Sequence, residues 1–410
     1  MDVKPAHFYR HDLPRLLISR EAILHNSRLI RRMLRPGAKV CAMIKADAYG
    51  HGAQIIIDTL CNYQADDLPS PAIDMAAVAC LDEASQLPEM PVPVLVLRPV
   101  ENVYVGPARE AIEHAIYSGW ILTLGTPSAA DDVARIAMAI GRRAAVHVMV
   151  DTGMMRCGTA IDQLPRLLEK IESHSALRIV TLGSHLATSE VRDHEFVHEQ
   201  IRAFHAASDT FTAQRPGKLI RTVANSGGIF FAPGSHFDMV RPGISLYGID
   251  PTCQPSVDRP LKPAAKWVAP LVSILDAKKG QSVGYGQTFR CDRDTRIGLV
   301  PVGYADGYLR SFGNHAKMIV EGVAVPVVGR VSMDLATIDL HDVPHAQIGS
   351  QVTVMDDDPL SPASAYALSN LANSIPYELF TRIGPRVKRV AVESLSEMNA
   401  ETRGNDKVTS

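Results

Sequence analysis

The chain has 410 residues, of which 46% are hydrophobic and 21% are charged, a composition typical of a globular protein with a sizeable core. This length predicts two domains, or one large barrel with a smaller partner, and the formal net charge of −2 argues against nucleic acid or an anionic membrane as the main partner. The N-terminal residues lack the apolar segment of a secretory signal, no run approaches about 18 apolar residues, and the six cysteines form no C-x-x-C pair. We therefore expect a cytoplasmic protein with free thiols and no membrane-spanning segment.

The first half of the chain alternates short apolar runs with helix-like segments. From Lys39 to about Gly248 the apolar runs are KVCAMIK, IDMAAVAC, VPVLVLR, WILTLG, RAAVHVMVD, LRIVTLGSH, KLIRTVAN and FDMVRPG. Strands separated by crossover-sized helical segments indicate parallel β/α units, and eight such strands close a barrel. The sequence therefore predicts an N-terminal (β/α)8 TIM barrel over residues 20–255, with an open doubly wound sheet as the alternative.

The pattern changes after the stretch PTCQPSVDRPLKPAAK. The short Val- and Ile-rich runs that follow are punctuated by Gly and Lys-Gly turns, which is typical of antiparallel strands joined by hairpins. We predict a C-terminal, mainly antiparallel β domain over residues 256–395, to which residues 1–19 could add the strand RLLIS (Arg15 to Ser19). Residues 396–410 are predicted to be a polar tail.

Chemically useful residues follow the predicted barrel strands. In a β/α barrel the functional residues lie at the C-terminal ends of the strands. Reading these ends in chain order gives Lys45, Asp151 with Arg156, His185, the loop from Asn225 to Gly228, and Arg241 with PGIS. Glycine-rich loops can offer backbone N–H groups to an anion, and the loops after the seventh and eighth strands are the recurrent phosphate site of such barrels. The sequence therefore predicts a phosphorylated ligand.

Lys45, at the end of the first apolar run, allows three interpretations. It could extend from the barrel mouth into solvent, it could bind phosphate, or it could be a Schiff-base nucleophile whose pKa is lowered by desolvation. A phosphate site across the same mouth favours the third interpretation, because pyridoxal 5'-phosphate (PLP) carries both an aldehyde and a phosphate.

One motif points to a different class of protein. HEFVH, which begins at His194, fits the H-E-x-x-H pattern of zinc proteases. A metzincin would continue with Gly and His at the positions where this chain has Ile201 and Phe204, and no glutamate that could serve as a further ligand occurs between Glu199 and Glu321. We therefore predict an outer barrel helix here and no metal site, with a zinc hydrolase as the outside alternative.

Taken together, the motifs of this chain resemble the alanine racemase family. Over roughly residues 15–390 they occur in the family's order: MIKADAYGHG, VDTGMMRCG, SHLATSE, ANSGG, DMVRPGISLYG, PVGYADGY, GRVSMD and PYELFTRIGPRV. The first and fifth are highly specific. The resemblance implies a PLP-dependent enzyme with an N-terminal barrel and a C-terminal β domain, which interconverts L- and D-alanine and supplies D-alanine for peptidoglycan.

The resemblance also implies a set of cofactor contacts. Lys45 would bind PLP covalently through its amine. Arg241 would face the pyridine nitrogen, where a permanently charged guanidinium does not surrender a proton to the ring. The other residues that the resemblance places at the cofactor are Tyr49, Ser226, Gly243, Ile244 and Tyr377 at the phosphate, together with His185 and Asn225.

Racemisation removes the α-proton from one face of an amino acid and returns a proton to the other, which two acid/base groups on opposite faces can accomplish. By resemblance these groups are Lys45 and Tyr304. An unperturbed tyrosine, with a pKa of about 10, is a poor base at neutral pH. The family supplies a chain of contacts from Tyr304 through His185 to Arg241, whose positive charge would stabilise the phenolate.

The resemblance further implies an obligatory homodimer. In the family the β domain of one subunit reaches the barrel of the other, so that active sites are shared between subunits. Tyr304, Met333 and Asp334 would therefore complete the partner's site, with Met333 and Asp334 near the substrate.

One position departs from the commonest pattern of the family. Arg156 resembles the arginine that holds the substrate carboxylate, and many members orient it with a carbamylated lysine two residues before DTGM. This chain has Met149 there, and a thioether cannot supply that negative charge. An anion from solution or another carboxylate would have to orient Arg156, which keeps a broader-specificity amino-acid or serine racemase as an alternative.

Two other classes share parts of the pattern. A non-catalytic PLP-binding barrel protein has the lysine but lacks a C-terminal β domain, so VGYADGY and GRVSMD argue against it. A related amino-acid decarboxylase pairs a barrel with a β domain but does not need Tyr304 as a second base.

Overall fold

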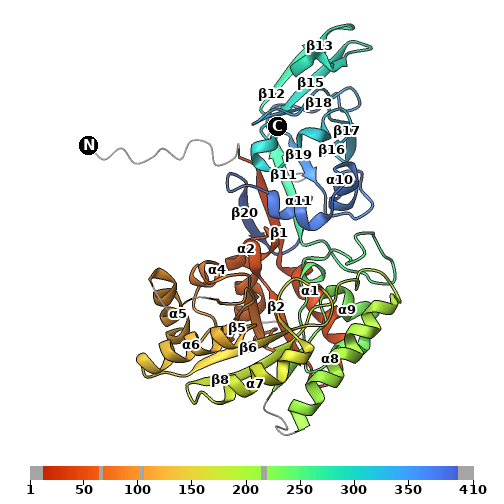
Figure 1. Cartoon of the computed structure of the whole chain (residues 1–410). Coiled ribbons are helices and arrows are strands. Elements are labelled where there is room, and N and C mark those ends of the chain that lie inside the picture. The colour runs from red at the N-terminus through yellow and green to blue at the C-terminus, as the bar shows by residue number, and fades with distance from the viewer. Residues whose placement is uncertain (1–12, 64–67, 102, 104–105, 214–218, 396–410) are drawn as a thin grey trace, which may run out of the picture. The chain divides into compact units, whose positions relative to one another are not determined.

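The computed structural model describes residues 13–63, 68–101, 103, 106–213 and 219–395, so the predicted polar tail lies outside the described residues (Figure 1). The chain forms two compact units. The first, called the barrel unit, comprises Asn26–Ala48 and Ile56–Leu246. The second, called the β unit, comprises Met1–His25, Tyr49–Ile55 and Tyr247–Ser410, as far as these ranges are described.

The barrel unit is built on eight parallel strands. They are β2 (Lys39–Met43), β3 (Met75–Val78), β4 (Val94–Val96), β5 (Ile121–Leu124), β6 (Ala144–Asp151), β8 (Leu177–Gly183), β9 (Ile220–Thr222) and β10 (Met239–Val240). Their order is β5-β4-β3-β2-β10-β9-β8-β6, and β6 also pairs with β5, which closes the barrel. A short strand, β7 (Thr159–Ala160), pairs with β6. Each barrel strand coincides with one predicted apolar run, so the predicted (β/α)8 barrel is confirmed and the open-sheet alternative is wrong.

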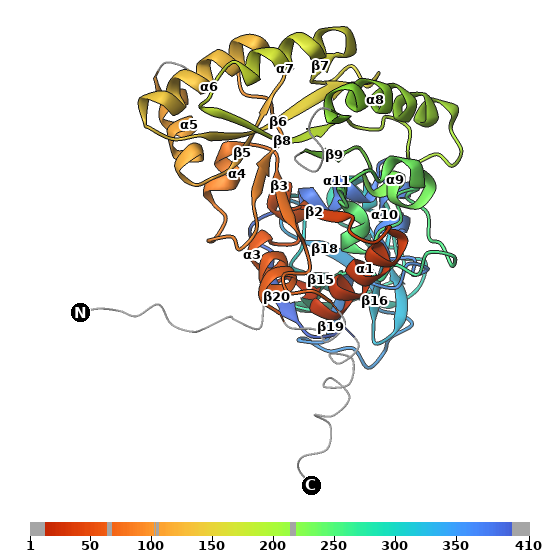
Figure 2. The same ribbon diagram turned by 90° about the horizontal axis from the view of Figure 1, so that it is seen from below.

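Helices connect the strands, and Figure 2 shows α5 to α8 on the outside of the barrel. The helices that follow barrel strands are α4 (Leu81–Ser85), α5 (Pro107–Tyr117), α6 (Pro127–Ala139), α7 (Leu164–Glu172), α8 (Glu195–Ala213) and α9 (Ser226–Phe231), while α1 (Arg20–Met33) precedes β2 and α3 (Ala53–Ile57) precedes β3. Helix α6 illustrates the local cause. Thr126 caps it by accepting a hydrogen bond from the Ala129 amide, Pro127 occupies its first turn, and Val133 and Ala137 lie on its buried face.

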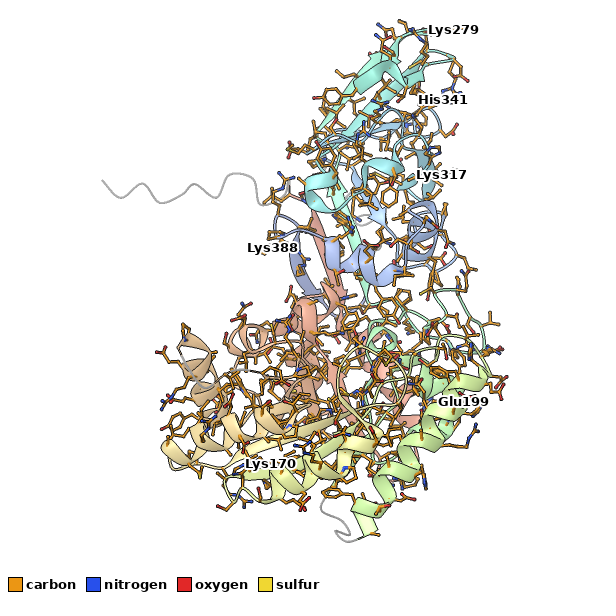
Figure 3. All side chains as sticks on the ribbon, viewed as in Figure 1. Lys170, Glu199, Lys279, Lys317, His341 and Lys388 are labelled. Atoms are coloured by element: carbon orange, nitrogen blue, oxygen red, sulfur yellow. The ribbon has the colours of Figure 1, made fainter. Side chains whose placement is uncertain are left out.

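The HEFVH motif lies at the start of α8, an outer helix on which Figure 3 labels Glu199. His194, Glu195 and His198 are exposed. Within the described residues, no group of three or more His, Cys, Asp and Glu side chains could hold a metal ion. The prediction of an outer barrel helix is confirmed.

The β unit contains three sheets that are mostly antiparallel. The largest has the order β17-β16-β19-β11-β1-β20. Its strands are β1 (Arg15–Ser19), β11 (Ala265–Pro270), β16 (Lys317–Val320), β17 (Val323–Pro326), β19 (Gln351–Met355) and β20 (Lys388–Val392); the smaller sheets are β12 (Ser273–Ala277), β15 (Thr295–Val300) and β18 (Ala336–Asp339), and β13 (Ser282–Val283) with β14 (Phe289–Arg290). The stretch RLLIS forms β1, which pairs antiparallel with β11 and parallel with β20.

The β unit also contains two helices that the sequence interpretation omitted, α10 (Ala365–Leu371) and α11 (Pro376–Arg382). Both begin with ordinary start signals. Ser364 accepts a hydrogen bond from the Ala367 amide at the start of α10, and Pro376 occupies the first turn of α11. No helix in the described part of the chain combines the length and apolarity needed to cross a membrane.

Candidate active site

Lys45 lies where β2 ends, at the mouth of the barrel. The preceding Ile44 is still held in the sheet, because its amide donates to the Ala77 carbonyl at 2.9 Å. The chain then passes through residues 46–49, four consecutive non-glycine residues with φ between 51° and 54°, in the turn labelled α2 (Lys45–Tyr49) in Figure 1. Left-handed backbone costs about 1–2 kcal/mol per residue. Specific contacts must therefore hold this turn.

The environment of Lys45 favours a neutral amine. The side chain is half-buried, and burial is the largest cause that lowers the pKa of its amine. The guanidinium charges of Arg156 and Arg241 lower this pKa further, while the carboxylate of Glu83 opposes them. A lysine whose pKa is lowered in this way has more of the neutral form that can attack a carbonyl. The structure thus brings Lys45, Arg156 and Arg241 within electrostatic reach of one another.

Arg241, directly after β10, is buried and firmly anchored. Its guanidinium donates to Thr222 Oγ1 (2.7 Å), to the Ser184 carbonyl (2.7 Å) and to the Val223 carbonyl (3.1 Å). One of its nitrogens lies 3.2 Å from His185 Nδ1. Burial lowers the pKa of Arg241 to about 10, so the side chain stays charged at neutral pH.

His185 is neutral in this arrangement. Burial and the charge of Arg241 lower its pKa well below the ordinary value. The guanidinium is a donor only, so Nδ1 must accept the hydrogen bond from Arg241 and the ring proton lies on Nε2. The part of the predicted chain of contacts that joins His185 to Arg241 is therefore present in the barrel unit.

Donor groups converge at the ends of β9 and β10. The buried hydroxyl oxygen of Ser226, at the start of α9, accepts hydrogen bonds from the Gly243 amide (3.0 Å), the Ser245 amide (3.3 Å) and the Ser245 hydroxyl (3.0 Å). With its oxygen accepting these bonds, the Ser226 hydroxyl can donate its own proton to an anion such as a phosphate. Asn225 instead caps α9, since its Oδ1 accepts from the Gly228 amide at 3.0 Å.

The loop that carries Arg156 is fixed by a carboxylate. Asp151 Oδ1 accepts from the amides of Gly153 (2.8 Å) and Met155 (3.2 Å). Arg156 itself is exposed, and Met149 is buried near the end of β6. Asp151 therefore shapes the backbone of the loop and leaves the guanidinium of Arg156 to be oriented by other groups.

Tyr49 and Tyr377 lie in an aromatic cluster of the β unit. The ring of Tyr49 is 5.2 Å from that of Tyr247 and 6.0 Å from that of Tyr377. The ring of His51 is 4.5 Å from Tyr247 and 4.6 Å from Phe380. Burial raises the pKa of Tyr49 to about 12, so this hydroxyl keeps its proton and can act as a donor.

Tyr304 begins a short turn (Tyr304–Asp306) after β15 and is 42% exposed. Buried Asp306 holds this turn: its Oδ2 accepts from the Gly303 amide at 2.9 Å, and its Oδ1 accepts from Arg386 Nε at 2.8 Å. Arg386 also donates to Asp334 Oδ1 at 2.7 Å. One arginine thus links the Tyr304 turn to the loop of Asp334.

The Tyr304 turn and the Met333 loop are also in direct backbone contact. The Ala305 amide donates to the Met333 carbonyl at 3.0 Å. A Cβ atom at Gly303 would lie 2.2 Å from that carbonyl oxygen, so the close approach requires glycine. The β unit therefore brings together three of its predicted site residues, Tyr304, Met333 and Asp334.

Sequence reasoning missed three residues that support these groups, Glu83, Asp306 and Arg386. Asp306 and Arg386 lie inside the motifs VGYADGY and PYELFTRIGPRV, where a buried acid and a matching base could have been suspected. Glu83 follows β3 in an ordinary helical stretch, and no local signal distinguishes it from Asp82.

A closed β/α barrel whose mouth holds a lysine of lowered pKa, two arginines and a donor-rich pair of loops defines a barrel enzyme that handles an anionic ligand through a lysine. Comparison with models of known protein families identifies the family within this class. The family model "Alanine racemase, N-terminal domain" matches residues 18–251, and "Alanine racemase, C-terminal domain" matches residues 264–391. The chain belongs to the alanine racemase family.

Individual relatives cover almost the whole chain. It is similar to the alanine racemase of Rhodospirillum rubrum, with 36% identity over 379 residues, 91% of this chain and 94% of the relative. It is similar to the biosynthetic alanine racemase of Pseudomonas aeruginosa, with 33% identity over 90% of this chain and 96% of the relative. The solved alanine racemase of Bartonella henselae, described with covalently bound pyridoxal phosphate, has a TM-score of 0.78 and 30% identity over 93% of this chain and 99% of that chain.

Proposed function

We propose that the chain is a PLP-dependent alanine racemase that interconverts L- and D-alanine. The observation that carries the proposal is the half-buried amine of Lys45, whose pKa is lowered at the barrel mouth by burial and by Arg156 and Arg241. Membership of the alanine racemase family supports alanine as the substrate, because the relatives from Rhodospirillum rubrum and Pseudomonas aeruginosa carry that name.

The residues at the ends of β9 and β10 fit the phosphate of PLP. The hydroxyl of Ser226, whose oxygen accepts from the Gly243 and Ser245 amides and whose own proton can be donated to an anion, supports a phosphate at this place. The residues that would surround the phosphate are Tyr49, Asn225, Ser226, Gly243, Ile244 and Tyr377. Asn225 would act indirectly, by capping α9 and so shaping the loop.

The residues of the barrel mouth fit the rest of the cofactor. Lys45 would hold the aldehyde carbon, and Arg241, anchored by four neighbouring acceptors, would face the pyridine nitrogen with His185 beside it. When bound, PLP supplies a conjugated electron sink that makes the α-proton of an attached amino acid acidic.

Two side chains would move the α-proton. Lys45 would remove it from D-alanine, and Tyr304 would remove it from L-alanine, on the opposite face. His185 accepts from Arg241 through Nδ1 and keeps its proton on Nε2, so it has a donor to offer to the phenolate of Tyr304. Each base would return a proton after the other had taken one, which inverts the α-carbon.

Arg156 would bind the substrate carboxylate, with Met333 and Asp334 near the substrate. Met149 keeps a second candidate open, a broader-specificity amino-acid or serine racemase, because it provides no charge to orient Arg156. Comparing kcat/KM for alanine, serine, lysine and arginine separates the two candidates: we expect alanine to be preferred.

We also propose a homodimer that works in the cytoplasm and supplies D-alanine for peptidoglycan. Tyr304 and Met333 are 42% and 54% exposed, which supports their completing the site of a second copy. The six free cysteines support a reducing compartment. The Pseudomonas aeruginosa relative named as biosynthetic supports the role in D-alanine supply.

The proposal predicts a covalent link between Lys45 and PLP. The protein purified with PLP should be yellow, and borohydride should bleach the colour and leave the reduced cofactor on Lys45, because reduction converts a reversible carbon–nitrogen link into a stable one. Peptide mass mapping measures the modified site. A colourless protein whose Lys45 stays unmodified in excess PLP would overturn the proposal.

A further inference from the structure

A single carboxylate connects the ends of the first two barrel strands. Glu83 lies in α4, the helix that follows β3 (Figure 1). Its Oε1 accepts a hydrogen bond from the Ala46 amide at 2.9 Å, and its Oε2 accepts one from the Ala79 amide at 2.6 Å. Ala79 directly follows β3, and β2 and β3 are paired neighbours. Because an ionised carboxylate has two acceptor oxygens and no donor, it can serve both amides at once.

Ala46 is the residue that needs such a partner. It directly follows Lys45 and is the first of the consecutive left-handed residues, with φ 51°. Within the turn, the Ala48 amide donates to the Ile44 carbonyl at 2.9 Å. The bond from Ala46 to Glu83 ties it to the neighbouring strand and so restrains the backbone from which the Lys45 side chain extends.

The negative charge of Glu83 also acts on the amine of Lys45. Arg156 and Arg241 place positive charge around Lys45, and the charge of Glu83 acts on this amine in the opposite direction. The carboxylate is half-buried, so its field is less screened than that of an exposed residue.

We propose that Glu83 is the positioning residue of Lys45, holding the left-handed turn in place and supplying negative charge that acts on the amine. This inference rests on the proposed function, since the position of Lys45 matters to catalysis only where Lys45 carries PLP. Glu83 acts on Lys45 through the backbone of Ala46 and through its own negative charge.

The test compares three variants of the PLP-loaded protein. In Glu83→Gln one carboxylate oxygen becomes an NH2 group, which cannot accept from an amide, so one of the two bonds is lost. Peptide-resolved hydrogen exchange should show the amides of residues 45–50 exchanging about 3- to 10-fold faster. Removal of the negative charge also lowers the pKa of the Lys45 amine further. Because only the neutral amine links to the aldehyde of PLP, borohydride trapping of PLP on Lys45 should persist to lower pH.

Two matched variants separate the effect of the two hydrogen bonds that Glu83 accepts, called the clamp, from the effect of its charge. Asp82→Asn removes a charge from the same helix without touching either strand end, and it should change neither readout. Glu83→Asp keeps the charge but is one methylene shorter and cannot span both amides, so exchange should accelerate while the pH midpoint of trapping stays at the wild-type value.

The proposal is overturned if Glu83→Gln matches Asp82→Asn both in hydrogen exchange and in the pH dependence of trapping. It is also overturned if residues 45–50 of Glu83→Asp exchange at the wild-type rate. If Glu83→Gln does not fold, exchange in Glu83→Asp decides. Failure of the proposed function is a different result, namely wild-type protein that never carries PLP on Lys45, and the exchange of residues 45–50 still tests the clamp in that case.

Discussion

Replacing Lys45 by methionine is expected to slow alanine racemisation by about 10³-fold or more in both directions. The substitution removes the amine that would hold PLP and, at the same time, one of the two bases. Methionine fills a similar volume, so the end of β2 should stay folded. The measurement is the initial rate of D-alanine formation from L-alanine, and of the reverse reaction, in excess PLP.

Lys39→Met is the matched control for this prediction. Lys39 begins the strand that Lys45 follows, so it lies at the opposite end of the barrel, where its amine is 3.8 Å from a carboxylate oxygen of Asp74. This variant should keep near wild-type rates. Equal activity of the two variants would contradict the role given to Lys45.

Replacing Tyr304 by phenylalanine is expected to separate the two faces of the reaction. Because the enantiomers of alanine have the same free energy, the loss of one base must slow net racemisation equally in both directions. Exchange of the α-proton for deuterium without inversion need not slow equally for the two enantiomers. In D2O, exchange from L-alanine should fall by about 10²–10⁴-fold, whereas Lys45 should still exchange the α-proton of D-alanine.

The control for Tyr304→Phe is Tyr285→Phe, which removes a hydroxyl from another tyrosine of the β unit, 71% exposed. It should leave exchange from both enantiomers unchanged. NMR of the α-position follows both reactions. Equal loss of exchange from L- and D-alanine in Tyr304→Phe, or no loss at all, would argue against tyrosine and lysine acting on opposite faces.

Much of the fold could be predicted because the strands of a parallel barrel are buried on both faces and therefore form continuous apolar runs. Even a very short strand can be predicted in this way: the run FDMVRPG contains β10, which has only two residues, Met239 and Val240. In the β unit the same approach missed α10 and α11, which have seven residues each and lie in a domain predicted to consist of strands.

Two histidines of the barrel, His147 and His185, differ in their position along a strand. His147 lies inside β6, where it is buried, bonded to Thr181 Oγ1 at 2.7 Å, and held neutral by burial that lowers its pKa to about 3. His185 comes two residues after the end of β8 and contacts Arg241. The rule that barrel chemistry lies at the C-terminal strand ends therefore selected the histidine at the mouth.

Asp306 could be suspected from its motif, but its role and that of Glu83 could not be assigned, because both depend on contacts between distant parts of the chain. Glu83 meets Ala46 across 37 residues, and Arg386 meets Asp306 across 80 residues. The backbone amides from which each acid accepts are brought beside it only by folding. Sequence patterns show which residues could do chemistry, and the folded backbone shows which residues hold them.

The most direct test of the account is α-proton exchange by the wild-type protein in D2O, measured separately with L-alanine and D-alanine in the presence of PLP. We expect deuterium to enter the α-position of both enantiomers and each enantiomer to be converted into the other. Incorporation from one enantiomer alone, or incorporation into both without inversion, would contradict a two-base alanine racemase.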